Sequence, residues 1–201
     1  VLLLDEPLAA LDLKLRQRML VDLDNIHDEV GITFLYVTHD QSEAMSLSDS
    51  IAVINEGTVE QVGTPTEIYE APRSSFVAAF IGDTNFFEGN VTEVNEPYSK
   101  LSIEYFTDVL VYNDKKIKKG DRVYLSIRPE KFTISVNRPE LSEKYNIVRG
   151  TVEEIIYLGY HTKYWVRVNE SLVEAKRLHD TYMLDEKMIT WGGEVWLSWH
   201  A

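Results

Sequence analysis

Two short apolar runs near the start of the chain each end in polar side chains. The first, VLLLD, spans residues 1–5, and the second, ITFLYVTHD, spans residues 32–40. An unbroken apolar run of this length is typical of a strand that is buried on both faces of a parallel sheet. The pattern therefore predicts two buried strands, each with a polar cluster at its carboxyl end.

A helix is predicted between these two strands. Its apolar face is made by side chains at intervals of four, three and four: Met19, Leu23, Ile26 and Val30. The pattern covers residues 13–30, and Gly31 is expected to end the helix, because glycine readily adopts the left-handed conformation of a C-terminal cap. The order strand, helix, strand indicates an α/β fold.

Local signals predict the remaining elements of this first part. Asp40 followed by Glu43 is a capping-box pattern for a short helix near residues 41–48. SIAVINEGTVEQVG reads as a hairpin that turns at Glu56 and Gly57. TPTE begins a further helix with a threonine cap and a proline in the first turn, and SSFVAAFIG reads as a short apolar helix.

A different texture begins near residues 82–85. Short runs that alternate apolar and polar residues now follow at regular spacing: FFEGNVTEV, KLSIEYF, DVLVY, RVYLSIRPE, FTISV, RGTVEEIIYLG, KYWVRV and EVWLSW. Many short alternating strands indicate an all-β barrel or sandwich. The chain is therefore predicted to hold two domains, an α/β domain over residues 1–82 and an all-β domain over residues 85–201.

Charge is spread unevenly over these two parts. The chain of 201 residues has a net charge of −13, and residues 1–82, with 14 acidic and 4 basic side chains, account for −10 of it. Nucleic-acid binding needs clustered Lys and Arg, so nucleic acid is not an expected partner. The absence of cysteine excludes disulfides and thiolate metal sites. No apolar run approaches the ~20 residues of a membrane-spanning helix, so direct membrane insertion is not expected.

The polar residues at the two strand ends are candidate catalytic residues. Ligands of open α/β sheets bind at the carboxyl ends of the strands, which is where Asp5, Glu6 and His39 fall. Such an aspartate can hold Mg²⁺ beside a nucleotide, an adjacent glutamate can polarise an attacking water, and a histidine can contact the terminal phosphate. The plainer alternative is that Asp5 and Glu6 cap the following turn and that His39 is an ordinary loop residue.

The stretches around these residues resemble the ATPases of ABC transporters. VLLLDEPLAALD is similar to the Walker B motif and D-loop of that family, and LYVTHDQSEAMSLSDSIAVINEGTVEQVGTPTEIYEAP is similar to the H-loop of importer ATPases and the segment after it. The resemblance implies that residues 1–82 are the C-terminal part of a P-loop ABC ATPase domain. It also implies that Asp5 binds Mg²⁺, that Glu6 is the catalytic base and that His39 is the switch histidine.

The same resemblance assigns Ala10, Leu11 and Asp12 to the D-loop, which touches the partner subunit of a homodimer that sandwiches two ATP molecules. Asp12 is equally well placed to cap the helix over residues 13–30, and both roles can hold. The sequence contains neither G-x-x-x-x-G-K-[ST] nor an LSGGQ-like signature. Both motifs precede Walker B in this family, so we expect the chain to be the C-terminal part of a longer protein and to be inactive alone.

The second part resembles a different domain. FIGDTNFFEGNV, LSIRPEKFTIS and GTVEEIIYLGYHTKYWVRV are similar to the TOBE domain, an OB-like β-barrel attached to the ATPases of importers for polyamines, sugars, iron and oxyanions. With the terminal GGEVWLSWHA, the pattern is most similar to the spermidine/putrescine branch. Arg128, Pro129 and Glu130 form the RPE element of such domains. A ligand role and a strand-ending turn are equally compatible with it, because Pro129 restricts Arg128 to extended geometry.

Aromatic and histidine side chains of the barrel have structural explanations. Four tryptophans fall in this part of the chain: Trp165, Trp191, Trp196 and Trp199. They could form a stacking platform for bases, but in an acidic chain we expect core packing or subunit contact instead. His161 and His179 have no partner at metal-ligand spacing, so no metal site is expected in this domain.

Two functions from different classes remain open. The first is ATP hydrolysis by the parent protein, which would use ATP and Mg²⁺ to drive polyamine import. It would work with transmembrane permease subunits, as a peripheral protein at the cytoplasmic face of the bacterial inner membrane. The second is a regulatory, dimerisation or small-ligand-binding module of a sugar, iron or oxyanion importer. A helicase-type ATPase also has Asp-Glu after a strand, but the D-loop, the spacing to His39 and the β-barrel disfavour it.

Overall fold

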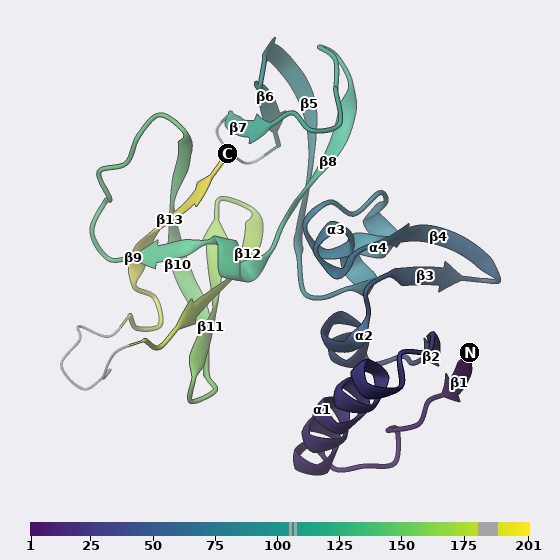
Figure 1. Ribbon diagram of the computed structural model, residues 1–201. Coiled ribbons are helices and arrows are strands. Elements are labelled where there is room, and N and C mark those ends of the chain that lie inside the picture. The colour runs from purple at the N-terminus through teal and green to yellow at the C-terminus, as the bar shows by residue number, and fades with distance from the viewer. Residues whose placement is uncertain (105, 107, 181–188) are drawn as a thin grey trace. The chain divides into compact units, whose positions relative to one another are not determined.

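The computed structural model describes residues 1–104, 106, 108–180 and 189–201. Contacts divide the chain into two compact units, Val1–Gly82 and Asp83–Ala201 (Figure 1). Within the described ranges, no helix combines the length and the apolar character needed to cross a membrane.

The first unit combines helices with two small sheets. In chain order its elements are β1 (Leu2–Asp5), α1 (Leu13–Val30), β2 (Phe34–Val37), α2 (Gln41–Leu47), β3 (Ile51–Asn55), β4 (Thr58–Gly63), α3 (Pro65–Glu70) and α4 (Ser75–Phe80). β1 and β2 pair in parallel, and β3 and β4 form an antiparallel hairpin. The turn residues Glu56 and Gly57 both have positive φ. The predicted helix over 13–30, its end at Gly31 in the left-handed conformation, and the hairpin are all confirmed.

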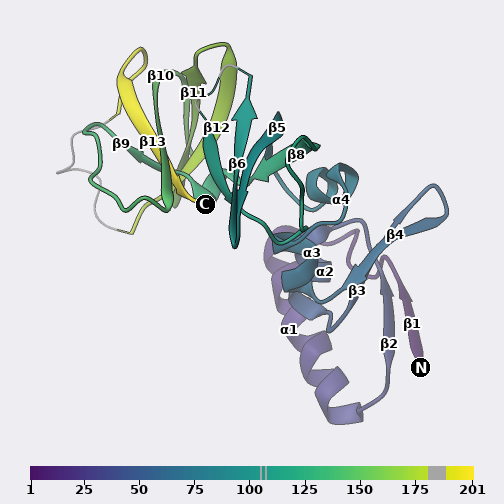
Figure 2. The same cartoon turned by 90° about the horizontal axis from the view of Figure 1, so that it is seen from above.

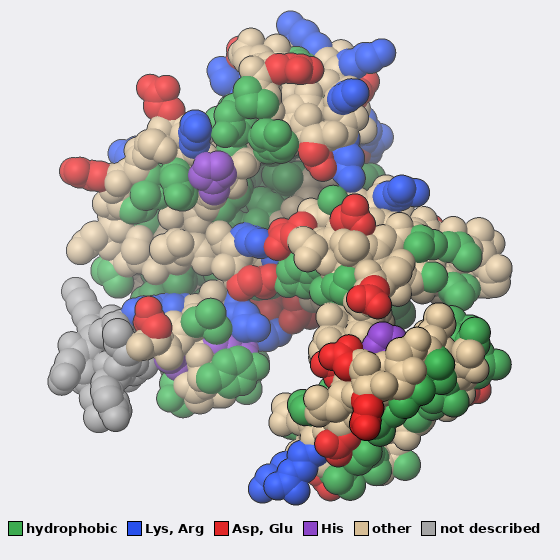
Figure 3. Space-filling model, viewed as in Figure 1, with side chains coloured by type: hydrophobic (Ala, Val, Ile, Leu, Met, Phe, Trp, Pro, Cys, Tyr) green, Lys and Arg blue, Asp and Glu red, His purple; other side chains and the backbone are tan. Residues whose placement is uncertain are grey.

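The predicted burial of the first two strands on both faces is wrong. Leu3, Leu35 and Val37 are exposed, and no residue of α1 is buried. β1 and β2 form a sheet of only two strands, which is too narrow to bury both of its faces. Figure 3 shows hydrophobic side chains gathered at the surface over these strands. The core of this unit lies elsewhere, between the hairpin, α3 and α4, and consists of Ile51, Val53, Ile68, Val77 and Ile81.

Over its described residues, the second unit consists of β-strands and one short 3₁₀ helix, in line with the predicted all-β fold. Its elements are β5 (Asn85–Asn95), β6 (Tyr98–Ile103), β7 (Val109–Tyr112), β8 (Arg122–Ile127), η1 (Pro129–Lys131), β9 (Thr133–Ser135), β10 (Tyr145–Tyr157), β11 (His161–Val168), β12 (Ser171–Leu178) and β13 (Glu194–His200). The strand expected in KLSIEYF ends at Ile103, and residue 105 lies outside the described residues.

These strands form two antiparallel sheets around one core (Figures 1 and 2). The orders are β7-β6-β5-β8 and β12-β11-β10-β13-β9. The five-stranded sheet curls, so that its edge strands β9 and β12 contact each other. Both sheets bury apolar side chains in the shared core, including Val91 and Leu101 from one sheet and Val166, Val173 and Leu197 from the other. The described chain as a whole is mostly β structure.

Candidate functional site

Two of the predicted catalytic side chains meet at the carboxyl ends of β1 and β2. Glu6 directly follows β1, and its backbone N–H donates to the carbonyl oxygen of Val37 at 2.8 Å, which extends the parallel pairing by one residue. His39 lies two residues beyond β2. The Oε1 atom of Glu6 and the Nδ1 atom of His39 are 3.0 Å apart. The parallel register therefore brings together two side chains that are 33 positions apart in the sequence.

This carboxylate–imidazole pair is open to solvent. The side chain of His39 is 73% exposed and that of Glu6 is 47% exposed. The hydrogen bond to Glu6, followed by the negative charge of Glu6, raises the pKa of His39 above its ordinary value. A carboxylate and an imidazole that is readily protonated are together suited to accepting and donating protons toward a ligand at this edge.

Glu6 also has an unusual backbone conformation. Its φ is 45°, in the left-handed region that residues with a side chain rarely occupy. Such a conformation costs of order 1 kcal/mol or more and persists where the surrounding structure holds it. Two hydrogen bonds fix this conformation. The N–H of Glu6 donates to Val37, and the carbonyl oxygen of Glu6 accepts from Ala9 N at 3.3 Å in the following turn.

The three residues assigned to the D-loop lie between this turn and α1. Ala10 and Asp12 are exposed, and Leu11 is half-buried, with its N–H donating to the carbonyl oxygen of Leu8 at 3.1 Å. Asp12 caps α1, since its Oδ1 accepts from Leu15 N at 2.9 Å. The structural role predicted for Asp12 is thus confirmed, and the assignment of these residues to subunit contact stays a prediction.

Sequence reasoning missed Arg16 and the role of Glu43. Arg16 donates from Nη1 to Asp40 Oδ2 at 2.6 Å and from Nη2 to the carbonyl oxygen of Leu11 at 3.2 Å. Glu43 is only 2% exposed, and its Oε2 accepts from the hydroxyls of Tyr36 and Thr38, both at 2.8 Å. These contacts surround the loop that carries His39.

The predicted capping box at the start of α2 is therefore only half formed. Asp40 Oδ1 accepts from Ser42 N at 2.8 Å and from Glu43 N at 3.3 Å, as a cap should. The carboxylate of Glu43 turns toward Tyr36 and Thr38 rather than back to the N-cap. Burial of Tyr36, and then its hydrogen bond to Glu43, raises the pKa of Tyr36.

Asp5 is the residue predicted to bind a divalent cation at this edge. It ends β1 and is exposed. Among the described residues, no group of three or more His, Cys, Asp or Glu side chains is arranged to hold a metal ion. Mg²⁺ is usually held by one or two carboxylates together with water and substrate phosphates, so a single exposed carboxylate such as Asp5 is compatible with it. The assignment of Asp5 to Mg²⁺ stays a prediction.

The barrel residues singled out in the sequence have mainly packing roles. Arg128 is buried, adopts an extended conformation before η1, and donates from Nη1 to the carbonyl oxygen of Asp83 at 3.3 Å. Trp199 lies in the core, with its ring centroid 5.2 Å from that of Phe132. Trp191 is 67% exposed. The strand-ending turn at Arg128 and the core role of Trp199 are confirmed.

Trp196, also on β13, lies beside two arginine side chains. The ring of Trp196 lies under the guanidinium groups of Arg138 and Arg149, at 5.3 and 6.0 Å from its centroid.

The two histidines of the second unit, His161 and His179, differ sharply in environment. His179 Nε2 is 2.8 Å from Thr162 Oγ1, whereas His161 is 3% exposed and both of its ring nitrogens lack a hydrogen-bond partner among the described residues.

Comparison with known proteins identifies the C-terminal part. Residues 125–201 match the family model described as the TOBE domain. This C-terminal part is similar to the TOBE domain. The matched residues run from β8 to the end of β13 and include the RPE turn, so the predicted resemblance of this part is confirmed.

Relatives match the whole chain. The spermidine/putrescine import ATP-binding protein PotA of Protochlamydia amoebophila is 54% identical over 202 residues, which cover 100% of this chain and 54% of the relative. The proteins of the same name from Thermotoga maritima and Fusobacterium nucleatum are each 50% identical, over 100% of this chain and 55% of their own length. The chain thus spans about half the length of these curated relatives. The resemblance to importer ATPases is confirmed along all of it.

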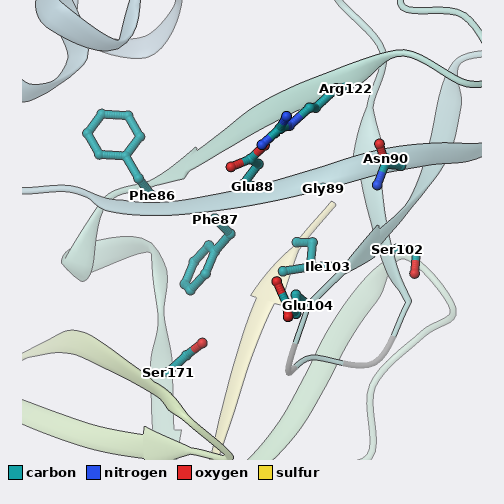
Figure 4. Close-up of a pocket in the computed structure, with 10 residues that line it drawn as sticks. All are labelled: Phe86, Phe87, Glu88, Gly89, Asn90, Ser102, Ile103, Glu104, Arg122 and Ser171. Carbon is teal, nitrogen blue, oxygen red and sulfur yellow. The ribbon is translucent and has the colours of Figure 1, made fainter.

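The second unit contains a hollow large enough for a small ligand. It measures about 460 Å³ and is lined by side chains of β5, β6, β8 and β12. Figure 4 shows Phe86 and Glu88 on one side of β5 and Phe87 on the other, facing Ser171. Glu88 pairs with Arg122, so the hollow has one neutralised carboxylate, one further carboxylate at Glu104, and aromatic walls.

Proposed function

We propose that the chain is part of the ATP-hydrolysing subunit of an ABC importer for polyamines such as spermidine and putrescine. Residues 1–82 would be the C-terminal part of its P-loop nucleotide-binding domain, and residues 85–201 its TOBE barrel. Whole-chain identity of 50% or more to three proteins named for spermidine/putrescine import supports this. The observation that carries it is the contact of 3.0 Å between Glu6 and His39 at the ends of two parallel strands.

The residues of this edge would divide the work of hydrolysis. Mg²⁺, held by Asp5, would neutralise charge on the phosphates of ATP. Glu6 would accept a proton from the attacking water as general base. His39, whose pKa is raised by Glu6, would donate a hydrogen bond toward the terminal phosphate. In the present structure Glu6 and His39 face each other, so each would exchange this partner for substrate or water in the loaded state.

The proposal also includes the partners of the subunit. Ala10, Leu11 and Asp12 would form the D-loop at the contact of a homodimer, close to the ATP bound there. The dimer would associate with transmembrane permease subunits and would lie as a peripheral protein at the cytoplasmic face of the bacterial inner membrane. The short segment between Leu8 and α1 is exposed at Ala10 and Asp12, as such a contact requires.

Substitution of Glu6 tests the catalytic assignment. In the full-length protein, Glu6→Gln should lower kcat for phosphate release by about 100-fold or more, because the amide keeps the shape of the carboxylate but cannot accept the proton. ATP should still bind. Glu29→Gln, at an exposed position of α1, should leave kcat unchanged. If Glu6→Gln keeps a tenth or more of the wild-type kcat, Glu6 is not the general base.

His39→Ala provides a second test at the same edge. It should lower kcat by about tenfold or more, through the loss of a hydrogen bond to the reacting phosphate. The side chain is 73% exposed, so the melting temperature should stay within the range of other surface substitutions. A normal kcat, or a large fall in melting temperature, would return His39 to the role of an ordinary loop residue.

The hollow of the second unit favours a second candidate function. With Glu104, Asn90 and Ser102 beside aromatic walls, this unit could serve as a regulatory module that binds a small polar ligand. Calorimetric titration with the transported solute of the importer tests this candidate, when the wild-type chain is compared with Glu104→Gln. Heat of binding that the substitution removes supports the regulatory module, and absence of heat removes this candidate.

A further inference from the structure

The guanidinium of Arg16 joins two segments that are far apart in the sequence. Its Nη2 donates to the carbonyl oxygen of Leu11 at 3.2 Å, and its Nη1 donates to Asp40 Oδ2 at 2.6 Å. Leu11 precedes α1, whereas Asp40 directly follows His39. A single side chain on the first turns of α1 thus contacts both the segment assigned to subunit contact and the loop of the candidate switch histidine.

A buried carboxylate holds this guanidinium from a third direction. Glu43 Oε1 lies 3.6 Å from Arg16 Nε. A buried carboxylate is costly unless it is paired and hydrogen-bonded, so the cation beside Glu43 is strongly favoured in this orientation. The planar fork of arginine donates to Asp40 and to the carbonyl oxygen of Leu11 at fixed angles while its charge faces Glu43, which the single ammonium of lysine cannot do.

The same network fixes both neighbours of His39. Thr38 donates to the carboxylate of Glu43 at 2.8 Å, and its Oγ1 accepts from Asp40 N at 3.0 Å. Asp40 is in turn held by Arg16. The backbone on each side of His39 is thereby restrained, while its imidazole reaches out to Glu6.

We propose that Arg16 is a positioning residue that couples the Leu11 segment to the loop of His39. The coupling is reciprocal, as any coupling free energy must be, so a change at either segment alters the other. The coupling itself does not depend on the proposed function, but its role in catalysis rests on that function. In that setting a partner subunit that presses on Ala10–Asp12 would adjust the position of His39 in the same chain through Arg16.

Amide hydrogen exchange of the 201-residue chain tests the coupling without ATP. The N–H of Leu11 donates to Leu8 O at 3.1 Å, so it is a protected probe of its segment. Asp40→Asn keeps an oxygen that can cap α2 but removes the charge that faces Arg16. It should speed exchange at Leu11 by about three- to tenfold, as the loss of a partly exposed ion pair allows. Asp24→Asn, at an exposed position of α1, should not.

The decisive comparison uses a second background. In Arg16→Gln, Leu11 exchange should already be fast, and adding Asp40→Asn should change it no further. Arg16→Lys keeps the charge but not the fork, so it should fold and also abolish the transmission; it supplies the background if Arg16→Gln does not fold. Unchanged Leu11 exchange in Asp40→Asn, or an equal effect in the Arg16→Lys background, would overturn the coupling.

Kinetics of the full-length protein separate this inference from the proposed function. Arg16→Lys should lower kcat for ATP hydrolysis with KM for ATP within about twofold, which is the pattern of a group that acts after binding. Arg18→Lys, exposed on the same helix, should leave both unchanged. Coupled exchange in a protein without ATPase activity would refute the proposed function and keep the coupling. Normal activity of Arg16→Lys together with uncoupled exchange would refute the coupling alone.

Discussion

His161 is a titratable side chain that the fold buries without giving it a hydrogen bond in the described structure. Burial lowers the pKa of its imidazole below the ordinary value, and the positive charges of Lys176, Lys163 and His179 lower it further. The Tyr160 ring packs against it, with centroids 4.2 Å apart. Folding therefore favours the neutral imidazole over the imidazolium.

The depressed pKa predicts a pH-dependent stability. Below the unfolded pKa of about 6.5, the unfolded chain binds a proton that the folded chain resists, so the stability contributed by neutral His161 is present above that pH and is lost as the pH falls. Urea midpoints measured between about pH 8 and pH 5 should fall less in His161→Gln than in the wild type. His200→Gln, at an exposed position, is the control; equal pH slopes in wild type and His161→Gln would contradict the prediction.

Some side-chain contacts could be predicted and others could not. The proximity of Glu6 and His39 was predictable because a parallel pair of strands brings its carboxyl ends to one edge. The contacts of Arg16 were not, because Leu11 lies in the segment before α1 and Asp40 in the loop after β2, and no local pattern places either beside Arg16. A charged residue on an amphipathic helix ordinarily faces solvent.

At the scale of elements, the short helix α3 combines an N-terminal cap with a buried side chain. α3 has a complete capping box: Thr64 Oγ1 accepts from Glu67 N at 3.3 Å, and Glu67 Oε2 accepts from Thr64 N at 2.8 Å. The hydrogen bond from the Thr64 backbone, then that from its side chain, lowers the pKa of Glu67. The fully buried side chain of Ile68 docks this helix on the core of the first unit.

Removal of this cap should loosen the first unit. Thr64→Ala should lower the free energy of unfolding by about 1 kcal/mol, because the N–H of Glu67 loses its acceptor. Thr64→Ser, which keeps the hydroxyl, should restore most of the loss. Chemical denaturation monitored by circular dichroism would measure both. Equal stability of Thr64→Ala and wild type would show that solvent satisfies the helix start as well as the side chain does.

The helices and the hairpin that the sequence predicted carry local signals, whereas β12, which it did not predict, does not. Cap residues, glycine and turn residues predict α1, α3 and the β3–β4 hairpin. β12 escaped prediction because its inward side chains include the small Ala175 beside Val173, while Glu174, Lys176 and Arg177 give the segment a helical composition. Its identity as a strand comes from pairing with β11, which no local pattern reports.

At the scale of the whole molecule, the boundary between the units lies slightly before the predicted start of the barrel. Asp83 belongs to the second unit. Its carboxylate accepts from Lys163 Nζ at 2.6 Å, and its carbonyl oxygen accepts from Arg128. Lys163 also pairs with Glu174 at 2.9 Å. A barrel that starts at residue 85 therefore lacks two contacts to β11 and to the turn after β8.

The second unit should fold alone and self-associate. Residues 83–201 have a core of their own, and the exposed Trp191 offers an apolar surface for contact. A protein of residues 83–201 should unfold at higher urea than one of residues 85–201, with a difference of ~1 kcal/mol or less, because surface ion pairs are weak. Sedimentation at ~10–100 μM should show dimers, a range suited to modest affinity.

Two results would contradict this expectation. A well-folded strict monomer at the highest concentration would remove the dimerisation role of the barrel. A protein of residues 83–201 without a cooperative transition would mean that the second unit needs the first in order to fold. Trp191→Ser is the matched variant, since it should weaken association without changing the urea midpoint.

The strand order of the five-stranded sheet has a consequence for how the protein is made. β13 lies between β10 and β9, yet it follows all other strands of that sheet in the sequence, and it carries the buried Val195, Leu197 and Trp199. A ribosome therefore releases β9 to β12 before the strand that joins them exists. Until then the open edge of β10 and the unfilled core are exposed to chaperones and proteases. Nascent chains stalled before residue 194 should therefore be degraded faster than chains that already include β13.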